Sequence, residues 1–88
     1  MIIKTSRGFE YEVEDAAADD MELLDALMDA DDGNVSAIRR AMILLIGEEG
    51  KKQLYDNCRG ESGRVSASAV MEEFKEILNN APKEIKNS

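Results

Sequence analysis

The chain has no histidine and no tryptophan among its 88 residues, and it has a single cysteine and a single proline. The absence of histidine removes the commonest general base and the usual base partner of a serine or cysteine nucleophile. The lone thiol, Cys58, can form neither an internal disulfide nor a zinc site built from cysteine and histidine. We therefore expect a non-enzymatic protein of a reducing cytoplasm, without catalytic residues, metal or cofactor, in which Cys58 is a core residue.

Basic residues are also scarce, with 11 Lys and Arg against 19 Asp and Glu, a formal net charge of −8. The deficit is local: residues 1–32 hold two basic and eleven acidic residues, a net −9, whereas residues 33–88 hold nine and eight, a net +1. Binding to nucleic acid needs fields of Lys and Arg against the phosphates. The charge balance therefore argues against nucleic acid as a direct ligand.

Long apolar runs are missing as well. No segment approaches the ~20 apolar residues of a membrane span, and the stretch from Met1 to Gly8 lacks the apolar core of a signal peptide. We expect no membrane contact and a protein that stays in aqueous solution. The longest apolar run is short, Ala41 to Ile46.

This run is predicted to be the second half of a helix over residues 35–46. Asn34 is a good N-cap residue, and Gly47 stands where a C′ residue belongs. One helical face carries five apolar side chains: Val35, Ile38, Ala41, Met42 and Leu45. We expect Ile38, Met42 and Leu45 to face the rest of the core. Ile43, Leu44 and Ile46 are then left over, and the thin core of so short a chain is expected not to cover them all.

The segment before this helix predicts a β-hairpin over residues 2–13. Ile2 to Thr5 and Phe9 to Val13 are rich in β-branched and aromatic residues, and Ser6-Arg7-Gly8 between them has the length and the glycine of a three-residue loop. Phe9, Tyr11 and Val13 should form the inner face. Because an isolated hairpin is marginally stable in water, it should lie on the helices.

A first helix is predicted over residues 15–30, with Asp15 as its cap and two apolar ridges. The ridges are Ala17, Met21, Leu24 and Met28, beside Leu23, Leu27 and Ala30. Its outer side carries the candidate acidic docking face, Asp19, Glu22, Asp25 and Asp29. Two interpretations stay open: a docking surface for a basic partner, or a solvated face whose repulsion is partly offset by Arg39 and Arg40.

Two further helices are predicted over residues 48–58 and 66–81. Leu54, Tyr55 and Cys58 share a face of the former, while Val65 and Ser66 supply a hydrophobic staple and an N-cap for the latter. Pro82 should end the last helix, and residues 83–88 are expected to form a flexible tail. The predicted fold is mainly α (α+β): one domain, residues 1–82, with an N-terminal β-hairpin packed on a bundle of about four helices.

Known motifs fit poorly. Gly47-Glu48-Glu49-Gly50 matches the bare GXXG of a KH domain, but the two glutamates would repel a nucleic-acid backbone. A P-loop needs four residues between its glycines and a Ser or Thr after the lysine, and neither is present.

The order of the elements resembles a known family. The segments IIKTSRGFEYEV, DDMELLDAL, LLIGEE, QLY and GRVS, in this order between Ile2 and Leu78, are similar to the small tail assembly chaperones encoded by siphophages and prophages of Gram-positive bacteria. The resemblance implies a non-enzymatic, ATP-independent chaperone of the host cytoplasm. Such proteins bind the long helical tape measure protein, keep it soluble, and leave as tail-tube subunits polymerise, so that they are absent from the mature virion.

The family offers no residue-level binding motif, so candidate contacts come from the apolar pattern. They are Ile43, Ile46, Tyr55 and Met71, for which ordinary core positions are the alternative. Self-association through the run from Ala41 to Ile46 is left open. The alternative function is that of an acidic DNA mimic, which would block a host nuclease or restriction system through the face formed by residues 10–32.

Overall fold

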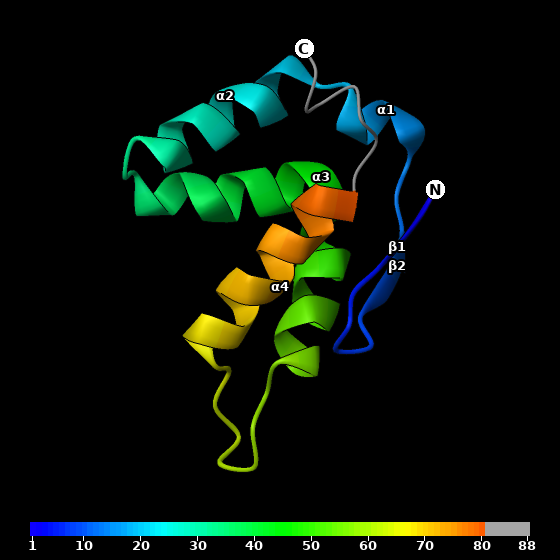
Figure 1. Ribbon diagram of the computed structural model, residues 1–88, viewed down its shortest axis with the longest axis vertical. Helices are drawn as coiled ribbons and strands as arrows, with labels where there is room; N and C mark the ends of the chain where they lie inside the picture. The colour runs from blue at the N-terminus through cyan, green and yellow to red at the C-terminus, as the bar shows by residue number, and fades with distance from the viewer. Residues whose placement is uncertain (81–88) are drawn as a thin grey trace.

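The structure is a computed structural model and describes residues 1–80. In this part of the chain, a two-stranded hairpin precedes four helices (Figure 1). The elements are β1 (Ile2–Lys4), β2 (Glu10–Glu12), α1 (Asp15–Ala18), α2 (Met21–Asp31), α3 (Val35–Asn57) and α4 (Ala67–Asn80). The mainly helical fold with an N-terminal hairpin is confirmed. The predictions for Ala81, Pro82 and the tail 83–88 lie outside the described residues.

The hairpin has the predicted loop and inner face. The strands pair antiparallel with Ile3 opposite Tyr11, and the Thr5 amide donates to the Phe9 carbonyl at 2.9 Å. Gly8 closes the loop with a φ of 93°, which glycine adopts at little cost. Phe9 and Val13 are buried and Tyr11 is half-buried.

The single helix predicted over residues 15–30 is wrong, because the chain breaks at Asp19 and Asp20. Asp20 is extended, and its carboxylate accepts from the amides of Glu22 at 2.8 Å and Leu23 at 3.4 Å. An aspartate that caps a new helix in this way satisfies backbone donors that a continuous helix would direct elsewhere. Asp15 does not cap α1, since Glu14 occupies the N-cap position and makes no side-chain bond.

Of the two predicted apolar ridges, the one that contains Leu23 and Leu27 packs in the core, as predicted. The other ridge differs from the prediction, because Met21 and Met28 are 62% and 49% exposed. Ala26 is also buried, so that the face of α2 through Leu23 and Ala26 packs on α3. The helix ends in a Schellman motif, in which Gly33 (φ 99°) donates to the Ala30 carbonyl and Asn34 to that of Asp29.

Helix α3 changes direction at Gly47, which separates two helical halves (Figure 1). Gly47 has φ 74° and ψ 175°, a conformation that is essentially restricted to glycine. The predicted helices 35–46 and 48–58 are thus the two halves of α3. Asn34 has the extended backbone of an N-cap residue, but its side chain caps no amide and instead accepts from the Ser36 hydroxyl at 2.7 Å.

Helix α4 begins as predicted, because the Ser66 hydroxyl accepts from the Ala69 amide at 3.2 Å. The tip of the hairpin is bonded to one side of α4: Ser6 donates its amide to Glu76 at 2.8 Å, and the Asn80 side chain donates to the Lys4 carbonyl at 2.7 Å. These bonds fix the hairpin on the helices, as the marginal stability of an isolated hairpin requires.

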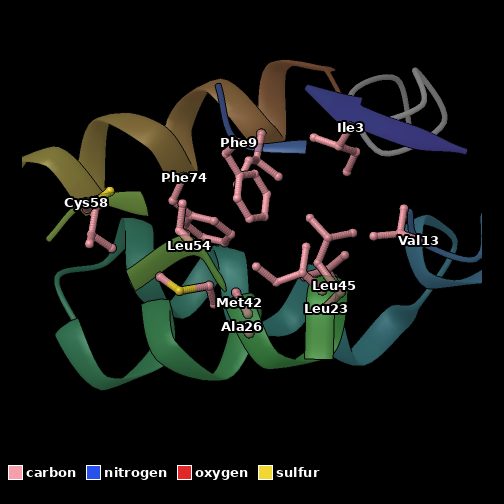
Figure 2. Close-up of a cluster of buried hydrophobic side chains, with 14 of the residues drawn as sticks. Ile3, Phe9, Val13, Leu23, Ala26, Met42, Leu45, Leu54, Cys58 and Phe74 are labelled. Carbon is pink, nitrogen blue, oxygen red and sulfur yellow. The ribbon is translucent and has the colours of Figure 1, made fainter. Parts of the chain in front are cut away.

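The core lies between the hairpin, α2, α3 and α4 (Figure 2). Ile3 and Phe9 enter it from the hairpin side, and Leu23, Leu45, Leu54 and Phe74 from the helices. Cys58 is buried at one end, as predicted. No helix within residues 1–80 is both long enough and apolar enough to cross a bilayer.

Candidate functional site

An apolar groove of about 320 Å³ is lined by residues from the first half of α3 and the first turns of α4. Figure 1 shows the angle at which these two helices lie. The walls of the groove come from four parts of the chain: Val35, Ile38, Arg39 and Met42 from the first half of α3, Tyr55 from its second half, Val65 from the loop, and Ala67, Val70 and Met71 from α4. We call this set the α3/α4 groove. Apart from Arg39 and the tyrosine hydroxyl, its side chains are apolar.

The bend at Gly47 produces the groove. Without it, Tyr55 would lie far along a straight helix from Val35, about 30 Å away at 1.5 Å per residue. The positive φ of Gly47 instead turns the second half of α3 so that Tyr55 lines the same groove as Val35. Spacings of three and four residues then align the lining side chains along each helix.

Two large apolar side chains that line the groove are exposed: Val35 is 76% exposed and Met71 is 38% exposed. Two others, Met42 and Val70, are buried and belong to the core. The groove is therefore continuous with the core and carries an apolar rim, an arrangement in which a partner could bury further apolar surface.

One positive charge lies in the groove, since the Arg39 side chain lines it and is exposed. The Lys51 ammonium lies 4.9 Å from the centroid of the Tyr55 ring, but Lys51 lines a neighbouring hollow together with Glu48, Glu49 and Asp56. At this distance the ammonium interacts favourably with the face of the ring, which also holds the ring in place.

The structure separates the four candidate contacts. Tyr55 and Met71 meet in the α3/α4 groove. Ile46 is only 3% exposed and packs near Gly50 and Tyr11, so the proposal that it contacts a partner fails in this conformation. Ile43 and Leu44 are half-buried. The hairpin thus covers Ile46, which we expected to be left over.

Val35 and Arg39 are groove residues that sequence reasoning missed. Val35 was assigned to the buried face of its helix because it shares the spacing of Ile38 and Met42, but it stands in the first turn, beyond the reach of the core. The position of Val35 next to the N-cap residue could have indicated its exposure, since the first turn of a helix commonly extends beyond the neighbouring elements.

The candidate acidic face lies on the outer side of α2 and the turn before it. Asp19, Glu22, Asp25 and Asp29 are all exposed. The Asp29 carboxylate accepts a hydrogen bond from Arg40 at 2.9 Å. This contact is of the kind expected if an arginine of the next helix partly offsets the repulsion among the acids. The exposure of the other three fits both interpretations, a docking surface and a solvated face.

Glu73 is a buried carboxylate that the sequence did not single out. It is 1% exposed and accepts from the Thr5 hydroxyl at 2.6 Å, while Arg7 Nε lies 3.8 Å from its other oxygen and Asn57 Nδ2 lies 3.5 Å away. These partners come from the hairpin and from the end of α3. Glu73 therefore joins three elements and is a structural group, since its oxygens already have protein partners.

Burial raises the pKa of the Cys58 thiol, with a further increase from the nearby Glu73 carboxylate that Arg7 partly opposes. A thiol held neutral is a weak nucleophile. Within residues 1–80, no three acidic or cysteine side chains gather closely enough to hold a metal ion. Among the features of residues 1–80, the α3/α4 groove is thus the one best suited to binding a partner.

Comparison of the chain with protein families, with curated proteins and with solved structures finds no match in any of the three.

Proposed function

We propose that this protein is a phage tail assembly chaperone that binds the tape measure protein and keeps it soluble while the tail tube assembles. The proposal comes from the resemblance of the segments between Ile2 and Leu78 to that family. The observation that supports it is the α3/α4 groove, with its exposed apolar rim of Val35 and Met71.

A protein that holds a helical client without ATP needs an apolar surface that is accessible but too small to cause its own aggregation. The groove meets both conditions, because its volume is only about 320 Å³ and the charged side chain of Arg39 lines it. Methionine is well suited to such a surface, since its unbranched side chain adapts to different partners. Recognition of an amphipathic helix in an apolar groove is a common mode of peptide binding.

Co-expression with the tape measure protein of the same genome tests the proposal. We expect the wild-type protein to move the tape measure protein from the insoluble to the soluble fraction. The Met71→Glu variant should lose most of this effect, because it places a charge on the apolar rim of the groove.

Met21→Glu is the matched control, since Met21 is another exposed methionine, on α2 and outside the groove. It should solubilise the client as the wild-type protein does. If the wild-type protein leaves the client insoluble, the proposed function is wrong.

A DNA-mimic inhibitor remains the second candidate because of the acidic face on α2. Asp19, Glu22 and Asp25 are exposed and, within residues 1–80, form no ion pair. That function requires a basic nuclease as partner and binding that weakens steeply with salt, whereas an apolar client would be held nearly equally at low and high salt.

A further inference from the structure

The two neighbouring arginines at the start of α3 differ in their surroundings. Arg40 donates to Asp29 at 2.9 Å, which places its charge on the α2 side of α3. Arg39 lines the α3/α4 groove and, within residues 1–80, has no ion-pair or hydrogen-bond partner. The guanidinium of Arg39 therefore has its donors free at the mouth of an apolar groove.

Among the described residues, no acidic side chain lines the groove to neutralise this charge. Glu72, next to Met71 on α4, pairs instead with Arg7 of the hairpin at 3.4 Å. The charge of Arg39 thus makes the groove locally positive in a protein whose formal net charge is −8.

We propose that the α3/α4 groove selects an amphipathic helix that carries acidic residues beside its apolar stripe. Apolar side chains at positions i, i+3 or i+4, and i+7 enter the groove and cover Val35 and Met71, and a flanking carboxylate pairs with Arg39. This inference rests on the proposed function, since it names the kind of client segment that the chaperone would hold.

The volume of the groove, about 320 Å³, fits this occupant. It lies at the lower end of the range for pockets that enclose a whole small molecule, roughly 300 to 1,000 Å³. A site of this size can receive anchoring side chains while the backbone of the partner helix stays outside. The carboxylate then adds specificity through its charge complementarity with Arg39.

The overall charge of the protein makes the opposite prediction. A net charge of −8 attracts basic peptides and repels acidic ones at long range. At 0.15 M salt, however, charges are screened over about 8 Å, so that Arg39, which lines the groove, acts on a bound side chain more strongly than the acids that lie outside the groove. Whether the groove prefers an acidic or a basic peptide therefore distinguishes recognition by Arg39 from attraction by the net charge of the protein.

Two labelled model peptides test the inference by fluorescence anisotropy with the full chain in 0.15 M NaCl. Both have the same helical apolar stripe; one has Glu and the other Lys at the positions that flank the stripe. We expect the Glu peptide to bind about two- to five-fold more tightly, the range that a single exposed ion pair of up to ~1 kcal/mol provides.

Substitutions then test whether Arg39 causes the preference for the Glu peptide. Arg39→Gln should remove the preference for the Glu peptide, and Arg39→Glu should reverse it. Arg40→Gln should leave it unchanged, because Arg40 is engaged by Asp29. Met71→Glu should weaken the binding of both peptides, which places them in the groove.

Three results would overturn the inference: tighter binding of the Lys peptide by the wild-type protein, a preference that Arg39→Glu does not alter, or no binding of either peptide. A dimer in sedimentation that Met71→Glu dissociates, together with no peptide binding, would assign the groove to a second copy of the chain. In each case a solubilised tape measure protein would leave the proposed function standing, so the two failures are distinguishable.

Discussion

Gly47 and Gly50 lie three residues apart in α3 and serve different purposes. Gly47 provides a positive φ, 74°, and its Cβ position is open. Gly50 is helical, but a methyl group there would lie 2.7 Å from Ile46 Cβ and 3.0 Å from Tyr11 Cε2. The former glycine bends the helix, and the latter lets the hairpin and Ile46 approach the backbone after the bend.

Gly50→Ala should destabilise the protein although alanine is the better helix former. Overpacking against Ile46 and Tyr11 costs about 2–3 kcal/mol, the upper part of the usual range, because the 2.7 Å contact is with a Cβ atom, and the gain in helix propensity returns about 1 kcal/mol. We expect a net loss of about 1–2 kcal/mol in the free energy of unfolding, measured by urea denaturation.

Gly60→Ala is the control for this substitution, because a methyl group there would meet only the Arg64 carbonyl at 3.9 Å. It should change the free energy of unfolding by less than about 0.5 kcal/mol. A Gly50→Ala variant as stable as wild type would show that the hairpin does not pack on α3 as closely as described.

At the scale of elements, sequence reasoning succeeded where a local signal determines the structure. Gly47 ends a helical segment because of its own backbone conformation, and Ser66 caps α4 through its own hydroxyl. The break before α2 also had a local signal, Asp20 ahead of an apolar helical pattern, but the spacing of Ala17 and Met21 favoured a continuous helix.

The α3/α4 groove could be predicted only in part. Tyr55 and Met71 were chosen as candidates, but nothing in the sequence gives the direction of the bend at Gly47 that places Tyr55 with Val35. Glu73 was missed for a related reason. A charged residue on an amphipathic helix is expected at the surface, and its burial depends on the hairpin that covers it.

The contact of the hairpin with α4 depends most on Glu73. Glu73→Ala removes the acceptor of Thr5 and the charge that faces Arg7, and it leaves a cavity between three elements. We expect the free energy of unfolding to fall by about 2–4 kcal/mol. Glu73→Gln, which keeps an acceptor for Thr5, should lose only about half as much.

Hydrogen exchange would locate the effect of Glu73→Ala, since the amides of β1 and β2 should lose more protection than those of α2. The control is Glu72→Gln, because the Glu72 side chain is 70% exposed and its ion pair with Arg7 contributes little. Equal loss of protection in all elements would contradict a specific role in docking the hairpin.

On the scale of the whole molecule, the clustering of acidic residues in one part of the chain lowers the stability of the fold. Residues 1–32 carry a net −9, from two basic and eleven acidic residues, and α2 has no basic residue in its last turn. Acids near the C-terminus of a helix, such as Asp31, oppose the helix dipole. Asp25 and Asp29 repel each other at i,i+4, although Arg40 offsets part of this.

Salt should therefore stabilise the protein. Between 0.02 and 0.3 M NaCl the Debye length falls from over 20 Å to about 6 Å, and screening should recover on the order of 1 kcal/mol of repulsion. For a domain of this size the melting temperature should rise by about 4–8 °C, as followed by circular dichroism.

The double variant Asp25→Asn, Asp31→Asn should have a higher melting temperature than the wild type at low salt, and its melting temperature should rise less with added salt. The control is the double variant Glu49→Gln, Glu61→Gln, which removes the same amount of charge from exposed positions outside residues 1–32. Its melting temperature should keep most of the salt dependence of the wild type. A melting temperature that falls with salt would mean that the exposed ion pairs, such as Arg40 with Asp29, contribute more to stability than the acidic segment costs.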